Sequence, residues 1–149
     1  MSEPATPHDR PAGQGPDGRP GDDRPALEPD VARAYEYFQV GRRFLAERRP
    51  AQAAMYLERA LRLVPDKNSV REALGRSYYA LGRYDGAARE FEELLRRAPA
   101  TDYAHFALAR CLLKLGDVAS ARGEARLAVA MSPGNDDYRR ALDDCLAAS

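Results

Sequence analysis

Two residue types that carry much of enzyme and metal chemistry are scarce in this chain of 149 residues. It has two cysteines, Cys111 and Cys145, and two histidines, His8 and His105. The cysteines are too few and too far apart for a disulfide framework, and no CxxC pair indicates zinc or redox chemistry. We therefore expect a reducing compartment, no bound metal and no cofactor.

Catalytic motifs and long apolar segments are also lacking. No HExxH, GxSxG or Walker-type Gly-Lys loop occurs. His105 occupies a packing position in a predicted helix, and both cysteines lie beside apolar residues, where an inert side chain is the common case. The N-terminus has no apolar region typical of a secretion signal, and no run approaches the roughly 18 apolar residues of a membrane span. We expect a cytoplasmic protein that is not an enzyme and does not bind membranes.

Charge divides the chain into an acidic start and a mildly basic body. Residues 1–30 contain seven acids and three bases, a net charge of −4. The whole chain has 23 of each, so residues 31–149 hold 16 acids and 20 bases, a net charge of +4. This excess is far below that of most nucleic-acid-binding domains, so we expect no nucleic-acid partner.

Residues 1–29 have the composition of a disordered tail. Seven of the eleven prolines and four of the eleven glycines lie within residues 1–30, with few large apolar residues among them. Such a segment cannot offset the entropy of ordering its chain. The tail is either a solubilising leader or a tethered ligand. The second interpretation is possible because a flexible segment of this length has a root-mean-square reach of roughly 30 Å, enough to fold back over the domain.

A fixed sequence period organises everything after the tail. Prolines recur at one constant interval, and two sets of small residues recur at the same interval: Pro65, Pro99 and Pro133; Gly41, Gly75 and Ala109; Ala53, Ala87 and Ala121. A fixed period between about 20 and 50 residues is typical of repeats that bury their apolar faces on their neighbours.

Each period is predicted to form a pair of helices. Asp30 is a plausible N-cap for a first helix that runs to about Glu47, Pro50 opens a second helix, and Pro65 ends it. In the next unit Ser69 and Glu72 have capping-box spacing. After the third unit, one further helix over 136–147 carries a polar outer face, Arg139, Arg140, Asp143 and Asp144, as the end of a stack requires.

In this phase the chain resembles the tetratricopeptide repeat family, whose 34-residue unit follows W-x2-L-G-x2-Y, A-x3-F and P. The matching positions are Tyr37, Val40, Gly41, Phe44, Ala53, Leu57, Ala60 and Pro65; Arg71, Leu74, Gly75, Tyr78, Ala87, Phe91, Leu94 and Pro99; His105, Leu108, Ala109, Leu112, Ala121, Ala125, Ala128 and Pro133. The resemblance covers about Val31 to Ala147. It implies an all-α domain over 30–149, with three helix–turn–helix units (34–67, 68–101 and 102–135) and a capping helix (136–147) in a right-handed superhelical stack.

The sequence departs from the family pattern at a few positions. Arg71 and His105 stand where the family prefers tryptophan, and Ala109 replaces the helix-packing glycine. In the first turn, Arg48 stands where the later turns have Gly82 and Gly116. We expect none of these changes to threaten the fold.

A second stripe on the first helix of each unit is the candidate binding surface. It contains an arginine in every unit, Arg42, Arg76 and Arg110, and flanking aromatic residues: Tyr35, Phe38, Tyr79, Tyr103 and Phe106. The family resemblance implies that this face lines a concave groove for peptides. If the first helices pack about 8–10 Å apart, the arginines form a ladder with that step. Guanidinium groups bind carboxylates and aromatic rings offer stacking surface, so the expected ligand is an acidic segment with apolar anchors.

One other interpretation of this stripe stays open, and a second is rejected. Arginine is common on solvated helices, Glu72 can pair with Arg76, and Phe38 can stack on its own Arg42, as Phe106 can on Arg110. The groove is also not that of the chaperone-tail-binding domains, whose clamp of Lys, Asn, Asn, Lys and Arg would fall on Phe38, Arg42, Ala73, Tyr103 and Ala107. Only one of these is cationic.

The function expected from the sequence is therefore a monomeric, non-catalytic scaffold or adaptor that binds a protein or peptide partner. Two alternatives remain. The chain could be a self-associating structural adaptor that uses an end of the stack, or a module whose groove is regulated by its own acidic tail.

Overall fold

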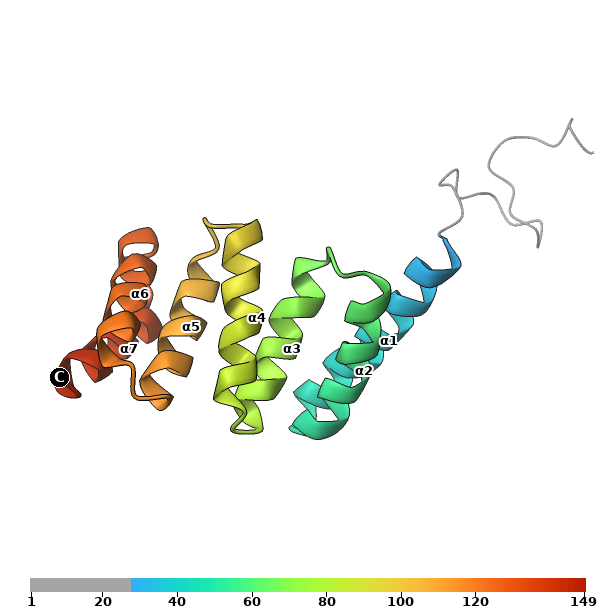
Figure 1. Cartoon of the computed structure of the whole chain (residues 1–149), viewed down its shortest axis with the longest axis horizontal. Coiled ribbons are helices and arrows are strands. Elements are labelled where there is room, and N and C mark those ends of the chain that lie inside the picture. Colours follow the sequence, from blue (N-terminus) through green and yellow to red (C-terminus); the bar gives the residue numbers. More distant parts are fainter. Residues whose placement is uncertain (1–27) are drawn as a thin grey trace, which may run out of the picture.

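The computed structural model describes residues 28–149, which are all-helical with no strand. Seven helices follow one another: α1 (Pro29–Ala46), α2 (Pro50–Leu63), α3 (Asn68–Ala80), α4 (Tyr84–Arg97), α5 (Asp102–Lys114), α6 (Val118–Met131) and α7 (Asp136–Ala147). Figure 1 shows them stacked from α1 at one end to α7 at the other. The predicted all-α repeat architecture is confirmed. The predicted disordered tail, residues 1–29, lies outside the described residues except for Glu28 and Pro29. Pro29 already belongs to α1, so the predicted end of the tail was one residue too late.

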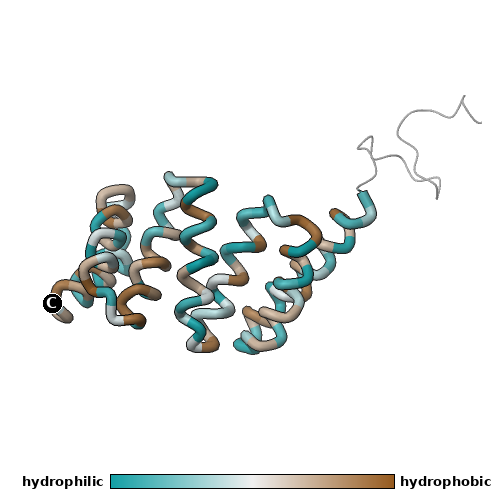
Figure 2. Tube along the Cα trace, in the orientation of Figure 1, coloured by the Kyte–Doolittle hydropathy of each residue, from teal (hydrophilic) through white to brown (hydrophobic). Residues whose placement is uncertain are grey.

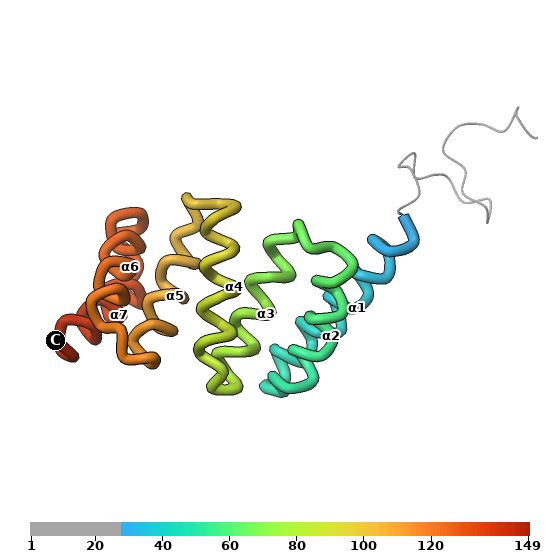
Figure 3. Tube along the Cα trace, viewed as in Figure 1, coloured from blue at the N-terminus to red at the C-terminus, as the bar shows by residue number. Residues whose placement is uncertain are grey.

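The helices pair in chain order, and one set of them forms the inner side of the stack. Every helix packs on the next one along the chain, as the colour sequence of Figure 3 lets the reader follow. The odd-numbered helices also touch across repeats, α1 with α3, α3 with α5 and α5 with α7, whereas no even-numbered pair does so within residues 28–149. Since a curved stack brings its elements closest on the inner side, α1, α3, α5 and α7 line the concave face.

Small residues let the two helices of each unit approach closely. A Cβ atom on Gly41 would lie 2.6 Å from Leu57 Cγ, and one on Gly75 would lie 2.8 Å from Phe91 Cζ. In the third unit the equivalent positions are Ala109 and Ala125, both fully buried. Position 109 therefore has a larger residue than glycine, and it faces Ala125, which is smaller than Leu57 or Phe91 in the other two units. Figure 2 shows hydrophobic and hydrophilic positions alternating around the helices.

Helix starts differ from the sequence prediction at two places. Helix α1 begins at Pro29, so Glu28 is the N-cap and the prediction of Asp30 was wrong. Helix α3 begins at Asn68 with Lys67 as its N-cap, and the Lys67 carbonyl accepts a hydrogen bond from the Arg71 backbone N–H at 3.2 Å. Ser69 therefore already lies inside the helix, and the predicted capping box with Glu72 does not form.

The turn inside each unit uses a left-handed backbone conformation. Gly82 and Gly116 have φ values of 76° and 86°, and Arg48 has the same conformation with φ of 60°. A side chain at such a position costs free energy that glycine avoids. Arg48 is therefore a local weakness of the first unit.

As for membrane association, no helix from α1 to α7 combines the length and apolarity that crossing a bilayer requires.

Candidate peptide-binding groove

The three predicted arginines lie in one line on the concave face. Arg42 is on α1, Arg76 on α3 and Arg110 on α5, and all three are exposed. Arg42 and Arg76 line one hollow of about 470 Å³, and Arg76 and Arg110 line a smaller one of about 120 Å³. Arg110 also lines a third hollow of about 630 Å³ at the C-terminal end. Consecutive hollows share an arginine, so they form one groove.

None of these arginines is neutralised by the rest of the domain. Among residues 28–149, no carboxylate forms an ion pair with Arg42, Arg76 or Arg110. Glu72 lines the same hollow as Arg76, yet the in-helix pair that the sequence allowed does not form. The groove therefore offers guanidinium groups that no carboxylate of the described chain neutralises.

Two of the three arginines form cation–π contacts with aromatic side chains. The Arg42 guanidinium lies 5.5 Å from the centroid of the Phe38 ring, and that of Arg110 lies 5.4 Å from Phe106. Both contacts are the stacking on the residue's own helix that the sequence allowed. Arg110 also lies 4.4 Å from the ring of Tyr79, which belongs to the preceding repeat. Sequence spacing within one helix could not have indicated this contact across repeats.

The other predicted aromatic residues differ in their environment. Tyr103 is half-buried in the groove, where its ring packs edge-on against Phe91 at a centroid distance of 6.2 Å. Burial raises the pKa of the Tyr103 hydroxyl, so this group stays a neutral hydrogen-bond donor. Tyr35 is 58% exposed and lines none of the three hollows. It lies outside the groove that the other seven predicted residues form.

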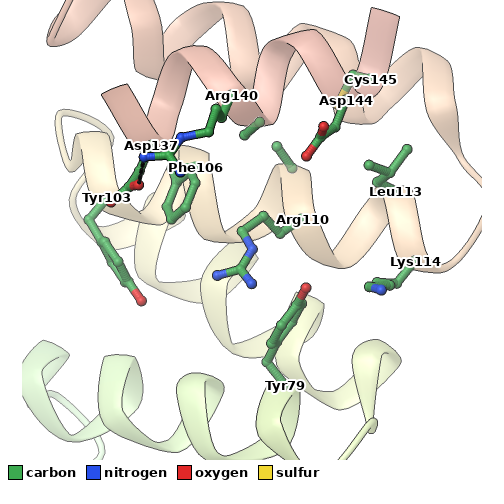
Figure 4. A pocket seen from close by; sticks show the side chains of 12 residues that line it. Tyr79, Tyr103, Phe106, Arg110, Leu113, Lys114, Asp137, Arg140, Asp144 and Cys145 are labelled. Carbon is green, nitrogen blue, oxygen red and sulfur yellow. Dashed lines mark hydrogen bonds and ion pairs between the residues drawn. The ribbon is translucent and has the colours of Figure 1, made fainter. Parts of the chain in front are cut away.

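The C-terminal hollow contains charged residues that sequence reasoning missed or misplaced. Figure 4 shows Arg110 reaching from α5 toward Tyr79 on α3, with Lys114 on the same wall. From α7 come Asp144 and Arg140, the latter paired with Asp137 at 3.1 Å. The sequence placed Arg140 and Asp144 on the outer face of the cap. That was wrong for these two, because α7 packs beside α5 and part of its polar surface completes the groove.

A second repeated feature lies outside the groove and serves the fold. The Arg71 side chain donates to Glu90 at 2.8 Å and to the Pro65 carbonyl at 2.9 Å. His105, at the equivalent position of the third unit, contacts Glu124 at 2.6 Å and the Pro99 carbonyl at 3.0 Å. In the first unit the same pair of positions is an aromatic contact, Tyr37 with Tyr56, at a centroid distance of 6.2 Å.

These contacts explain how the chain does without tryptophan at this position. The tryptophan of the family pattern is replaced by a polar bridge between the two helices of a unit. Arg71 and His105 are thus engaged inside the scaffold and are not candidates for ligand binding.

The two cysteines are buried and unreactive. Burial raises the pKa of the Cys111 thiol to about 12, and it raises that of Cys145 as well. A thiol that stays protonated at neutral pH is a poor nucleophile and a poor metal ligand. Across residues 28–149, no group of three or more His, Cys, Asp or Glu side chains could hold a metal ion.

Comparison with known proteins agrees with this architecture. A model of the tetratricopeptide repeat matches residues 38–90 and again residues 72–136, which together span well over half of the chain. The chain belongs to the tetratricopeptide repeat family. No curated protein matches the sequence.

Solved structures, tetratricopeptide repeat domains among them, share the fold at low sequence identity. The first such domain of Spaghetti (RPAP3), bound to the HSP90 peptide SRMEEVD, is 12% identical with a TM-score of 0.75, covering 83% of this chain and 98% of that one. The Sgt2 domain from Aspergillus fumigatus is 18% identical with a TM-score of 0.71, covering 82% and 80%. The Yersinia enterocolitica secretion chaperone SycD, in complex with a peptide of the translocator YopD, is 18% identical with a TM-score of 0.68, covering 76% and 90%.

Proposed function

We propose that this protein is a non-catalytic interaction module whose concave groove binds an acidic peptide segment or partner helix with apolar anchors. One observation carries the proposal: three arginines without carboxylate partners in the described domain stand one repeat apart along a continuous groove. They supply the positive charge. Phe38, Tyr79 and Phe106 supply surfaces for the apolar anchors. Aromatic contacts already restrict the Arg42 and Arg110 side chains in the free protein, so these side chains lose less conformational entropy on binding.

Two solved relatives of the fold support a peptide as the ligand. The Spaghetti domain was solved with an HSP90 peptide and SycD with a YopD peptide. The ligand of this protein would differ from the HSP90 tail, because the clamp positions of the chaperone-tail-binding domains are Phe38, Arg42, Ala73, Tyr103 and Ala107 here. We propose that the protein acts as a monomer, which sedimentation at two concentrations would test. We also propose that it acts in the cytoplasm.

Selection from a random peptide library on the immobilised full-length protein tests the function. Acidic peptides with aliphatic or aromatic residues should be enriched, and their affinities can then be measured by fluorescence polarisation. Reversal of two groove charges, Arg42→Glu with Arg110→Glu, should weaken these peptides at least about tenfold, since two charged contacts become repulsive. Enrichment of basic peptides, or of none, would contradict the proposal.

A matched control separates the groove from general charge effects. Arg89 on α4 and Arg126 on α6 are exposed and lie outside the three hollows. The double variant Arg89→Glu with Arg126→Glu has the same net charge as the groove variant. Its peptide affinity should fall much less, while both variants keep the circular-dichroism spectrum of the wild type. Equal loss in both would show that bulk charge, not the groove, captures the peptides.

Charge complementarity favours one further candidate, regulation by the acidic tail. Residues 1–27 contain five acids and three bases, a net charge of −2, and the chain continues from them into α1, which lines the N-terminal end of the groove. If this segment competes for the arginines, deletion of residues 1–27 should raise the affinity for the selected acidic peptides. An unchanged affinity would leave the tail without a role in the groove.

A further inference from the structure

We infer that Arg110 and Lys114 form an anion-binding subsite, which takes a carboxylate side chain of the ligand next to an apolar residue. The inference rests on the proposed function and specifies where in the groove the acidic residue binds. It lies away from the clamp positions of the chaperone-tail-binding domains, which in this repeat are Tyr103 and Ala107. It also includes Lys114, a residue outside the repeating arginine pattern.

Aromatic rings from two other helices hold the two cations. The Arg110 guanidinium lies 4.4 Å from the Tyr79 ring centroid, and Lys114 Nζ lies 6.0 Å from that of Tyr84. The two rings contact each other edge-on, with centroids 5.2 Å apart. Helices α3, α4 and α5 thus position both positive groups on one wall of the groove. A site assembled from three helices is more ordered than two free surface side chains.

The pair carries an unfavourable charge interaction that a bound anion would relieve. Arg110 and Lys114 are four residues apart on α5, so their Cβ atoms lie about 5–6 Å from each other and their charges repel. Over residues 28–149, neither has a carboxylate within ion-pair distance. One carboxylate placed between the two cations would bridge them. The apolar residue beside it would lie on Ala109, Leu113 and Ala141, which line the same hollow.

The opposite wall of the hollow defines where an anion cannot bind. Asp144 on α7 forms no ion pair with any residue from 28 to 149, whereas Asp137 is already paired with Arg140. A ligand carboxylate near α7 would face the negative charge of Asp144. The acidic residue of the ligand is therefore directed to the α3–α5 side, which gives the ligand an orientation across the groove.

The scarcity of lysine makes a direct test possible with the full-length protein. The chain has two lysines, Lys114 in the groove and Lys67 in the loop before α3, where it is exposed. Reductive methylation with 13C-formaldehyde labels both lysines and the N-terminal amine and keeps their charge, and the two lysine methyl resonances are assigned with the Lys67→Arg and Lys114→Arg variants. The probe is the peptide acetyl-Leu-Glu-Glu-Leu amide. Its control is acetyl-Leu-Gln-Gln-Leu amide.

The subsite predicts a specific pattern of shifts. The Lys114 resonance should move with the Glu peptide and not with the Gln peptide, and the Lys67 resonance should stay in place. The variant Arg110→Gln should weaken the apparent affinity about threefold, typical of one lost exposed charge contact. Asp144→Asn should strengthen it about twofold, because the repulsion on the opposite wall is removed.

Three outcomes would overturn the inference. These are a Lys114 resonance that the Glu peptide does not move, equal shifts with both peptides, or shifts produced by inorganic phosphate but not by the Glu peptide, which would assign the site to phosphorylated side chains. The result is separable from the proposed function. If the Lys114 resonance does not move but reversal of Arg42 and Arg110 abolishes peptide binding, the subsite is refuted and the proposed function stands. If the Glu peptide shifts the Lys114 resonance but no acidic peptides are enriched from the library, the subsite stands and the proposed function is contradicted.

Discussion

The guanidinium of Arg110 lies 4.4 Å from the ring of Tyr79, so an arginine that lines the groove in the third repeat contacts a side chain of the second. Substitution Tyr79→Leu should remove the ring-current effect on the Arg110 Nε–Hε resonance and shift it toward its random-coil position. Exposed cation–π contacts contribute about 0.5–1 kcal/mol, so the fold should remain stable. Arginine side-chain NMR measures this directly, and a resonance unchanged in the variant would contradict the contact.

The Arg71–Glu90 pair should stabilise the second repeat more than a surface ion pair does. Their side chains are only 10% and 19% exposed and lie 2.8 Å apart. Arg71→Leu should lower the free energy of unfolding by about 2 kcal/mol, because Glu90 then loses its partner. The double variant Arg71→Leu with Glu90→Leu should lose less than the sum of the single losses.

Urea unfolding of the four proteins in this double-mutant cycle measures the coupling. The exposed pair Arg89 and Asp85, 4.0 Å apart, serves as the control and should show a coupling below about 0.5 kcal/mol. Additive effects of the Arg71 and Glu90 substitutions would refute a role for this pair in stability.

Gly75 should be intolerant of even one added methyl group. A Cβ at this position would lie 2.8 Å from the Phe91 ring, which is itself fully buried. Gly75→Ala should therefore lower the free energy of unfolding by about 1–3 kcal/mol, despite the better helix propensity of alanine. The opposite change in the third repeat, Ala109→Gly, should cost only about 1 kcal/mol from backbone entropy. Chemical denaturation would contradict this if the Gly75 variant were as stable as the wild type.

Replacing Arg48 with glycine should stabilise the protein. Arg48 adopts φ of 60° in the first turn, where Gly82 and Gly116 occupy the equivalent turns. Glycine adopts the same left-handed conformation without the steric cost of a Cβ atom, so the free energy of unfolding should rise by about 0.5–1 kcal/mol. Gly82→Ala is the reciprocal control and should reduce stability. A destabilised Arg48→Gly variant would indicate that the arginine side chain makes contacts that outweigh its backbone strain.

Alkaline conditions should weaken the fold through buried hydroxyl groups. Burial, together with a hydrogen bond to Glu58, raises the pKa of Tyr78 to about 12, above its ordinary value of 10.0. Between these values the folded state retains a proton that the unfolded state has lost, so the free energy of unfolding falls as pH rises. Burial raises the pKa of Tyr138 and Cys111 to about 12 as well, which acts in the same direction.

Urea unfolding between about pH 9 and 12 measures this dependence, and the variant Tyr78→Phe should show a shallower decline than the wild type. Stability that is independent of pH over this range would refute the assignment.

The sequence was sufficient for the architecture because the residues that set it act locally and repeat. Pro65, Pro99 and Pro133 each follow the second helix of a unit, and the alternation of small and large residues identifies the faces that pack. The period also located Arg42, Arg76 and Arg110 on one face, and the structure places them in one groove.

What the sequence could not indicate depends on distances between units. The contact of Tyr79 with Arg110, and the inward position of Arg140 and Asp144, follow from how far the stack curves and how α7 closes it. Neither is encoded by spacing along a single helix. The capping box at Ser69 failed for a different reason, since the backbone after Pro65 enters the helix two residues before the motif requires.

The bridge from Arg71 to the Pro65 carbonyl has a consequence for how such repeats can be exchanged. Arg71 also binds Glu90, and Arg97 binds Asp66 at 3.1 Å, so a segment cut as residues 65–98 keeps all three contacts inside it. A cut at residue 68 would separate Arg71 from the Pro65 carbonyl and Arg97 from Asp66, and would keep only the Arg71–Glu90 contact. The cassette suited to transplantation or duplication therefore begins at the proline of one unit and ends just before the proline of the next.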